Sequence, residues 1–132
     1  MRKAPLAAAL VVAAIALPTA LAAGAKTTVS VKLSEFKVVP SPKSATAGAV
    51  VFDVRNTGAI DHEFDVVRTS LPVGKLPVKG AKVSLKPLGR ISPLKPGTSK
   101  TLRLTLKPGR YVLYCNVAGH YQAGQRIAFT VR

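Results

Sequence analysis

The feature that most constrains this fold is a series of short stretches in which polar and apolar residues alternate. The stretch from Thr101 to Lys107 has its leucines at every second position and charged or hydroxyl side chains between them. A period of two residues is typical of a β-strand with one buried face. The same reasoning predicts five further strands, over residues 28–33, 50–54, 64–67, 111–115 and 127–131.

Turn-forming residues separate these stretches. Proline, glycine and asparagine cluster at residues 40–42, 56–58, 95–97 and 107–110. The chain has 132 residues, which is enough for one domain, and no stretch has the periodicity of a helix of ten or more residues. Short strands with regular turn signals predict an all-β fold built as a β-sandwich.

The segment from Leu71 to Pro96 interrupts the strand pattern. Four prolines inside it lie at Pro72, Pro77, Pro87 and Pro93. Because proline cannot donate to a strand ladder, we expect at most edge strands here, with residues 83–85 as a candidate. An insert of this length is either a binding loop or a flexible cover for the domain.

The N-terminal stretch has the pattern of a secretory signal peptide. Two basic residues, Arg2 and Lys3, precede an apolar run from Leu6 to Leu17, and small residues follow that run. A basic start, an apolar centre and a small-residue cleavage site are the marks of such a signal. We therefore predict a signal peptide over residues 1–25.

The small residues place the expected cleavage after Ala22 or Ala25, which leaves a domain over residues 26–132. The alternative is an uncleaved anchor, because residues 6–25 are about long enough to span a bilayer. In both cases we expect the domain to be exported, to the periplasm, the cell envelope or the extracellular space.

The charge of the chain is strongly positive and unevenly distributed. Twenty lysines and arginines face five acidic residues, giving a formal net charge of +15. Thirteen basic and no acidic residues lie from Val66 to Arg132, while residues 26–65 carry five of each, so residues 26–132 have a net charge of +13. Such a field attracts acidic redox proteins or an anionic membrane or cell-wall surface, or serves only to keep the protein soluble. We expect a monomer without a nucleic-acid partner, because no recognition motif accompanies the charge.

The chemically reactive residues fall into two segments. The only cysteine and the only two histidines are Cys115, His62 and His120, and Gln125 opens the last predicted strand. The alternation of the strands puts the side chains of His62, Cys115 and Gln125 on the faces that point into the sandwich, with His120 on the loop between two strands. One thiolate and two imidazoles, with a weak axial methionine or glutamine, form the ligand set of a blue-copper site.

These residues also allow two other interpretations. A lone cysteine is often a small buried apolar residue, but an unpaired thiol in an exported protein is open to oxidation unless something occupies it. Zinc is the competing metal, although its structural sites usually have four cysteine or histidine ligands and its catalytic sites keep a water. The ligand set therefore favours one copper ion.

The two segments resemble the cupredoxins, the plastocyanin and azurin family of small blue copper proteins. The motif N-x-G-x(3)-H-x-F spans Asn56 to Phe64, and G-x-Y-x(3)-C-x(4)-H-x(4)-Q spans Gly109 to Gln125. The resemblance implies a Greek-key β-sandwich or barrel. It also implies that the metal ligands are the residues matching the family's positions, namely His62, Cys115, His120 and Gln125.

Two departures from the family pattern bear on the site. The axial position, usually methionine, is Gln125, as in stellacyanin-like members, which bind copper with an axial glutamine. Glu63 stands where many members have asparagine after the first histidine. Only the backbone N–H of Glu63 is then left to donate toward the Cys115 sulfur.

The resemblance implies a protein that carries single electrons between redox partners and is not an enzyme. The exposed edge of His120 would pass the electron, and Val117, Ala118, Gly119 and Tyr121 would surround it as an apolar patch. The alternatives are a copper carrier or reservoir that delivers the ion to an oxidase, and a structural or adhesive sandwich that has lost its metal. The chain lacks the methionine- and histidine-rich tracts that carriers often have.

Overall fold

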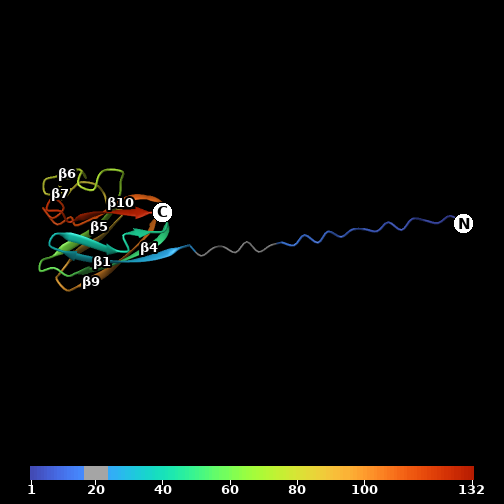
Figure 1. Ribbon diagram of the computed structural model, residues 1–132, viewed down its shortest axis with the longest axis horizontal. Helices are drawn as coiled ribbons and strands as arrows, with labels where there is room; N and C mark the ends of the chain where they lie inside the picture. Colours follow the sequence, from blue (N-terminus) through green and yellow to red (C-terminus); the bar gives the residue numbers. More distant parts are fainter. Residues whose placement is uncertain (17–23) are drawn as a thin grey trace.

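The computed structural model describes residues 1–16 and 24–132. Residues 1–16 are exposed, have no regular secondary structure and extend away from the folded domain (Figure 1). Of the two expected cleavage positions, Ala22 lies outside the described residues and Ala25 directly precedes the first strand. Among the described residues, no helix is long and apolar enough to cross a membrane.

The domain is built from two main sheets. The first has the strand order β2-β1-β4-β9, in which β1 and β4 run parallel and the other pairs are antiparallel. Its strands are β1 (Lys26–Ser34), β2 (Lys37–Ser41), β4 (Gly48–Asn56) and β9 (Ser99–Leu106).

The second sheet has the order β3-β11-β10-β5-β8. Its strands are β3 (Ser44–Ala45), β5 (His62–Arg68), β8 (Gly89–Leu94), β10 (Gly109–Tyr114) and β11 (Arg126–Val131). A separate two-stranded ribbon pairs β6 (Val78–Lys79) with β7 (Lys82–Val83) inside the insert. All six predicted strands are present, and the predicted all-β fold is confirmed.

The main core lies between the two sheets. Phe52 of β4 packs against Phe64 of β5 and Phe129 of β11, with ring centroids 5.3 and 5.7 Å apart. The residues that share the strand faces of His62, Cys115 and Gln125 belong to this core, as the alternation predicts: Phe64, Val66, Tyr111, Leu113, Phe129 and Val131. The predicted inward direction of these three strand faces is therefore confirmed.

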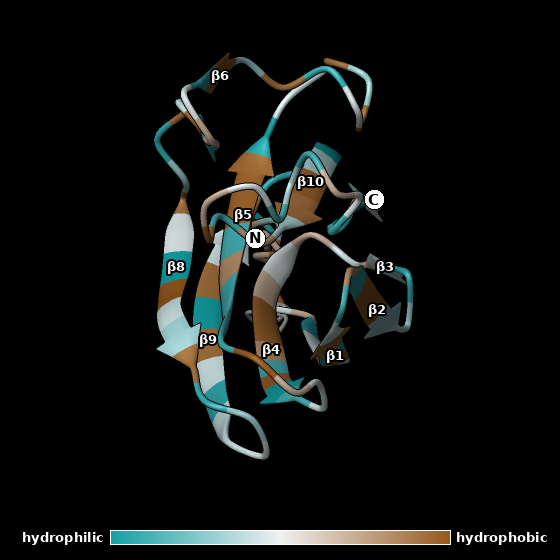
Figure 2. Cartoon of the chain, turned by 90° about the vertical axis from the view of Figure 1, so that its left-hand side faces the viewer, coloured by the Kyte–Doolittle hydropathy of each residue, from teal (hydrophilic) through white to brown (hydrophobic). Residues whose placement is uncertain are grey.

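The insert covers the outer face of the second sheet. It arches over β5 and β10, so that these two strands are buried on both faces (Figure 2). A second apolar cluster fills the space beneath it: Val67, Leu76, Val83, Val112, Tyr114 and Tyr121. Later in the insert the chain forms β8, which has a proline in it and pairs only with β5 at the sheet edge. The expectation that only edge strands form in the insert is confirmed.

Candidate metal centre

His62 begins β5 after a short loop that Asn56 holds together. The Asn56 amide donates to the carbonyls of Ile60 and Leu94, both at 2.8 Å, and its oxygen accepts from the N–H of Gly58 at 2.9 Å. Because Asn56 is fully buried, these bonds fix the path of the loop and with it the position of the first histidine.

The second segment is a compact loop between β10 and β11 that carries Cys115, His120 and Gln125. The Cys115 N–H donates to the carbonyl of Gln125 at 3.0 Å and closes the loop at its base. The Gln125 N–H donates in turn to the His120 carbonyl at 3.1 Å. Gly119 and Gly124 have φ angles of +81° and +110°, which side-chain-bearing residues rarely adopt, so both turns require glycine.

The fold brings three donor groups together that lie far apart in the sequence. The ligand atoms of His62, Cys115 and His120 all lie within 4.8 Å of one another. Cys115 Sγ lies 3.5 Å from His120 Nδ1, and the two imidazole centroids are 5.2 Å apart. His62 and Cys115 are fully buried and His120 is 9% exposed. A mixed set of one thiolate and two imidazoles is suited to copper, and this cluster fits one copper ion.

Glu35, in the turn directly after β1, determines which nitrogen of His62 is available to a metal. Its carboxylate oxygen Oε1 lies 2.8 Å from His62 Nε2 and also accepts the N–H groups of Ala59 and Ile60 at 2.9 and 3.1 Å. An ionised carboxylate can only accept, so Nε2 carries the proton and Nδ1 keeps its lone pair. Among the residues that the structure describes, that buried Nδ1 has no hydrogen-bond partner, as a metal-binding nitrogen requires.

The same contacts keep Glu35 ionised. The hydrogen bond to His62, helped by the two backbone N–H groups, lowers the pKa of Glu35 to about 2. Gly58 leaves room for this carboxylate, since a Cβ at that position would collide with it. Sequence reasoning did not assign Glu35 to the site, because neither spacing nor strand alternation connects the end of β1 to His62.

The thiol of Cys115 lies in an apolar environment with directed N–H groups. Burial raises the pKa of Cys115 to about 11, while the backbone N–H groups of Glu63 and Val117 oppose that rise. The Glu63 N–H lies 3.2 Å from Sγ, so the expected backbone donation to the sulfur is confirmed. A bound cation would favour the thiolate and offset the cost of burying its charge.

The carboxyl group of Glu63 points away from the three donors. It pairs with Arg90 Nε at 2.8 Å, beside the Asp65–Arg90 ion pair at 2.8 Å. Burial, together with Asp65, raises the pKa of Glu63 to about 7. Glu63 therefore contributes its backbone, and not its carboxylate, to the candidate centre.

Gln125 is fully buried and its amide has a fixed orientation. Two carbonyl oxygens, those of Ser34 and Lys37, lie 2.9 and 3.3 Å from its Nε2. Only the NH₂ group of the amide can donate to two carbonyls, so the atom next to them is Nε2. The amide oxygen Oε1 therefore points away from these two carbonyls. Within the described parts of the chain, residues 1–16 and 24–132, that buried oxygen has no hydrogen-bond partner.

The surroundings of His120 differ from the expected patch. Tyr121 is buried, and its hydroxyl donates to the Val73 carbonyl at 2.8 Å and accepts the Leu76 N–H at 3.0 Å. The aromatic residue beside His120 is instead Phe36, whose ring centroid lies 5.0 Å away in an edge-on arrangement and which is 38% exposed. The assignment of Tyr121 to the surface patch is therefore wrong, because its hydroxyl finds partners only under the insert.

Comparison with a protein-family model decides the family. Residues 6–128 match the model of the cupredoxin-like domain. The chain belongs to the cupredoxin family. No curated protein sequence matches this cupredoxin.

Solved structures with the same fold include two auracyanins and rusticyanin. Reduced auracyanin from the photosynthetic bacterium Roseiflexus castenholzii has 24% identity and a TM-score of 0.60, with 83% of this cupredoxin and 99% of that chain covered. Rusticyanin from Thiobacillus ferrooxidans has 17% identity and a TM-score of 0.63, with 83% and 79% covered. Auracyanin A, described as a "blue" copper protein from Chloroflexus aurantiacus, has 15% identity and a TM-score of 0.56, with 82% and 100% covered.

Proposed function

We propose that this cupredoxin holds one copper ion between His62, Cys115 and His120 and carries single electrons between redox proteins. The observation that carries the proposal is the convergence of the three donor atoms within 4.8 Å, with an unpartnered lone pair on His62 Nδ1. A copper ion bound there would accept and release one electron by alternating between Cu(I) and Cu(II).

The framework around the donors supports electron carriage, which depends on small changes in geometry. The Glu35 carboxylate holds the ring of His62, and the Glu63 N–H is directed at the Cys115 sulfur. Hydrogen bonds within the 115–125 loop fix the remaining donors. Ligands oriented in this way keep their positions when the charge at the centre changes, so little reorganisation accompanies transfer.

We further propose that Gln125 supplies a weak fourth ligand through Oε1. Its support is the pair of hydrogen bonds that hold Nε2 on the Ser34 and Lys37 carbonyls, together with the absence of any partner for the buried oxygen. An amide oxygen is a harder donor than the thioether usual in the family and favours Cu(II).

The proposed route for the electron is the partly exposed ring of His120, beside Phe36. The ribbon of β6 and β7 lies next to it, because the Gly119 N–H donates to the Ala81 carbonyl at 2.8 Å. Exposed Lys79 and Lys82 flank Ala81. We propose that these lysines attract an acidic redox partner to this end of the molecule.

The location of the protein is also a proposal. Arg2, Lys3 and the apolar run from Leu6 to Leu17 support export, and the part of this segment that the structure describes lies outside the sandwich. We propose that the cupredoxin works in the periplasm or at the cell envelope, where a free cysteine needs the protection that bound copper gives.

Burial of the donors disfavours copper delivery as the main function. His62 and Cys115 have no exposed surface, so handing the ion to an oxidase would require the site to open. A carrier should lose Cu(I) rapidly to a competing chelator, whereas an electron carrier should exchange electrons many times before losing copper. Stopped-flow measurement of both rates on one sample separates the two functions.

The decisive experiment is titration of the purified protein with Cu(II), followed by visible absorption. We expect one copper per chain and an intense thiolate-to-Cu(II) band in the red. Cys115→Ser should abolish the band, and His62→Ala should weaken copper binding and distort the spectrum. A band that persists without Cys115, or copper binding unchanged by His62→Ala, would contradict the proposed site.

A further inference from the structure

Among the residues that the structure describes, the end of the sandwich opposite the donor cluster carries basic side chains and no acidic side chain. Six exposed side chains surround this end, which we call the basic end: Lys26, Lys43, Arg68, Lys107, Arg110 and Arg132. The strand directions place it there, because His62 begins β5 at one end of the molecule and Arg68 closes it at the other. β10 runs antiparallel to β5, so it begins with Gly109 at the basic end and finishes with Tyr114 at the donor end.

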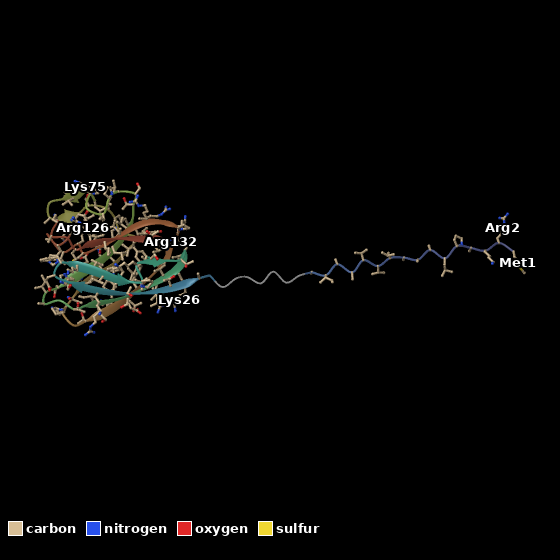
Figure 3. The ribbon with its side chains drawn as sticks, viewed as in Figure 1. Met1, Arg2, Lys26, Lys75, Arg126 and Arg132 are labelled. Atoms are coloured by element: carbon tan, nitrogen blue, oxygen red, sulfur yellow. The ribbon has the colours of Figure 1, made fainter. Side chains whose placement is uncertain are left out.

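Hydrogen bonds between chain segments bring one half of the basic end together. Arg132 pairs through its backbone with Ala45 and Ala47, at 3.0 and 2.7 Å. The N–H of Thr46 donates to the hydroxyl of Thr27 at 3.2 Å, which joins the start of β1 to the same segment. Lys26 and Arg132 accordingly lie at the same end of the domain, away from Lys75 and Arg126 (Figure 3).

The other half is a shallow hollow lined by groups that bind phosphate. Arg68, Thr69, Ser70, Gly109 and Arg110 surround a volume of about 650 Å³. The Thr69 N–H donates to the Arg110 carbonyl at 3.0 Å, and Arg68 Nη2 donates to the Pro108 carbonyl at 2.8 Å. Guanidinium and hydroxyl groups in one hollow are suited to phosphate oxygens.

The acidic residues all lie elsewhere. Glu35, Asp61 and Glu63 stand at the donor end, and Asp65 is buried in its ion pair with Arg90. Asp53, in the middle of β4, is bonded to the hydroxyl of Thr101 at 2.9 Å. The positive potential of the basic end is therefore not offset locally.

The N-terminal segment leaves the domain from this same end. Ala25 lies against Gly48 at the start of β4, where its carbonyl is 2.8 Å from the position a Cβ would take. The described residues 1–16, which include most of the apolar run, lie outside the folded domain (Figures 1 and 3).

We propose that the basic end docks on an anionic phospholipid surface. Basic residues near such a surface are each attracted to it, and the attraction falls off within a Debye length. The hollow at Arg68 and Arg110 would receive a phosphate headgroup. This orientation keeps the donor cluster on the side away from the lipid, open to a redox partner, and it does not depend on whether copper is bound.

Vesicle co-sedimentation of the full chain tests the proposal. One set of vesicles is phosphatidylcholine alone, and the other is phosphatidylcholine and phosphatidylglycerol in equal parts. The basic-end variant is Lys26→Gln with Lys107→Gln and Arg110→Gln. Its matched control removes the same charge elsewhere, through Lys75→Gln with Lys95→Gln and Lys100→Gln. All six side chains are exposed, so both variants should fold, which circular dichroism verifies.

We expect the affinity of the basic-end variant for anionic vesicles to fall on the order of 100-fold, which is about fivefold for each basic residue removed. The affinity of the control variant should change far less. Equal losses in the two variants would overturn the proposal, because net charge alone would then explain binding. Equal binding of the parent to neutral vesicles would also overturn it, in favour of the apolar segment. Release by inorganic phosphate at constant ionic strength would assign a single-phosphate site in place of the lipid surface.

Discussion

At the scale of single residues, the contact between Glu35 and His62 shapes the candidate centre most. A carboxylate that accepts from one ring nitrogen fixes the tautomer, orients the ring and increases the basicity of the other nitrogen. It also places a negative charge 2.8 Å from a proposed ligand. A fixed negative charge near the metal stabilises the higher oxidation state, so Glu35 should lower the reduction potential.

Replacing Glu35 tests this effect. Glu35→Gln keeps an oxygen that can accept from His62 Nε2 but removes the charge, so the reduction potential should rise. Glu35→Ala removes the acceptor as well and should weaken Cu(II) binding by about 10–100-fold. Redox titration and competitive copper titration measure the two effects. Asp61→Asn is the matched control, because Asp61 precedes His62 and is exposed. Equal shifts of potential in Glu35→Gln and Asp61→Asn would contradict a role through the hydrogen bond.

Gln125 offers a second prediction at this scale. If Oε1 binds the metal axially, Gln125→Met should raise the reduction potential, since a thioether favours Cu(I). Each rise of about 59 mV is a tenfold change in the one-electron equilibrium. Gln125→Leu is the control without an axial donor. Similar potentials for the parent and both variants would mean that Gln125 only fills space and bonds Ser34 and Lys37.

At the scale of elements, the insert is a structural support for the ligand loop. The side chain of Asn116, directly after Cys115, accepts the Val83 N–H at 2.8 Å and donates to the Val83 carbonyl at 3.1 Å. Tyr121 joins the same loop to Val73 and Leu76. Glu63 stands where many cupredoxins have an asparagine tying the strand to this loop. In this cupredoxin the side chain of Asn116 connects the ligand loop to β7 instead, through its two hydrogen bonds to Val83.

Loss of the hydrogen bonds between Asn116 and Val83 should lower the stability of the fold and speed the release of copper from the candidate centre. Asn116→Ala leaves buried backbone groups of Val83 unpaired, at a cost of about 1–3 kcal/mol for each group. Urea unfolding of the metal-free protein measures this loss, and copper release to a chelator measures the loosening. Ser84→Ala removes an exposed hydrogen bond to Pro77 in the same insert and should change stability by less than about 0.5 kcal/mol. Copper release unchanged by Asn116→Ala would show that the insert is only a cover.

Strand alternation predicted the two-layer fold because one face of most strands packs on the core and the other meets solvent. Strand alternation did not predict the edge strands, which do not follow this pattern. In β2, Lys37–Ser41, prolines signalled a turn at residues 40–42, yet Pro40 and Ser41 pair with β1 as an edge strand. In β8 the chain also tolerates Pro93, since β8 has a partner on one side only.

The candidate site was predictable only as far as local spacing reaches. His62, Cys115, His120 and Gln125 follow from motifs and strand faces, and the fold brings the three metal-donor groups together. Glu35 and Phe36 come from the turn between β1 and β2, which only tertiary packing brings to the histidines. Tyr121 was misplaced for the related reason that no local signal predicts which side of the loop the insert covers.

At the scale of the whole molecule, charge and chemistry are separated along the long axis of the sandwich. The donor cluster and its nearby acidic residues lie at one end, and the basic end lies at the other. The separation is not complete: Lys37, Lys95 and Arg126 also lie near the donor cluster, and the ribbon of β6 and β7 brings Lys79 and Lys82 beside the His120 loop. The net charge of +13 on residues 26–132 therefore serves two separate surfaces in our interpretation.

The positive charge of residues 26–132 makes a prediction about electron transfer. Transfer to an acidic acceptor should slow steeply as ionic strength rises through about 0.1 M, where the Debye length is about 10 Å. A basic acceptor should show the opposite trend. Stopped-flow rates measured over a series of salt concentrations give both slopes.

Lys79 and Lys82 should account for much of this salt dependence, because their ribbon is hydrogen-bonded to the loop that carries His120. Lys79→Gln with Lys82→Gln should reduce the rate with the acidic acceptor at low salt and flatten its salt slope. Lys26→Gln with Lys107→Gln removes the same charge at the opposite end of the sandwich. Salt should screen those charges from the docked partner, so this pair should leave the slope nearly unchanged. If both pairs flatten the slope equally, the partner responds to total charge, and the β6–β7 ribbon has no special part in docking.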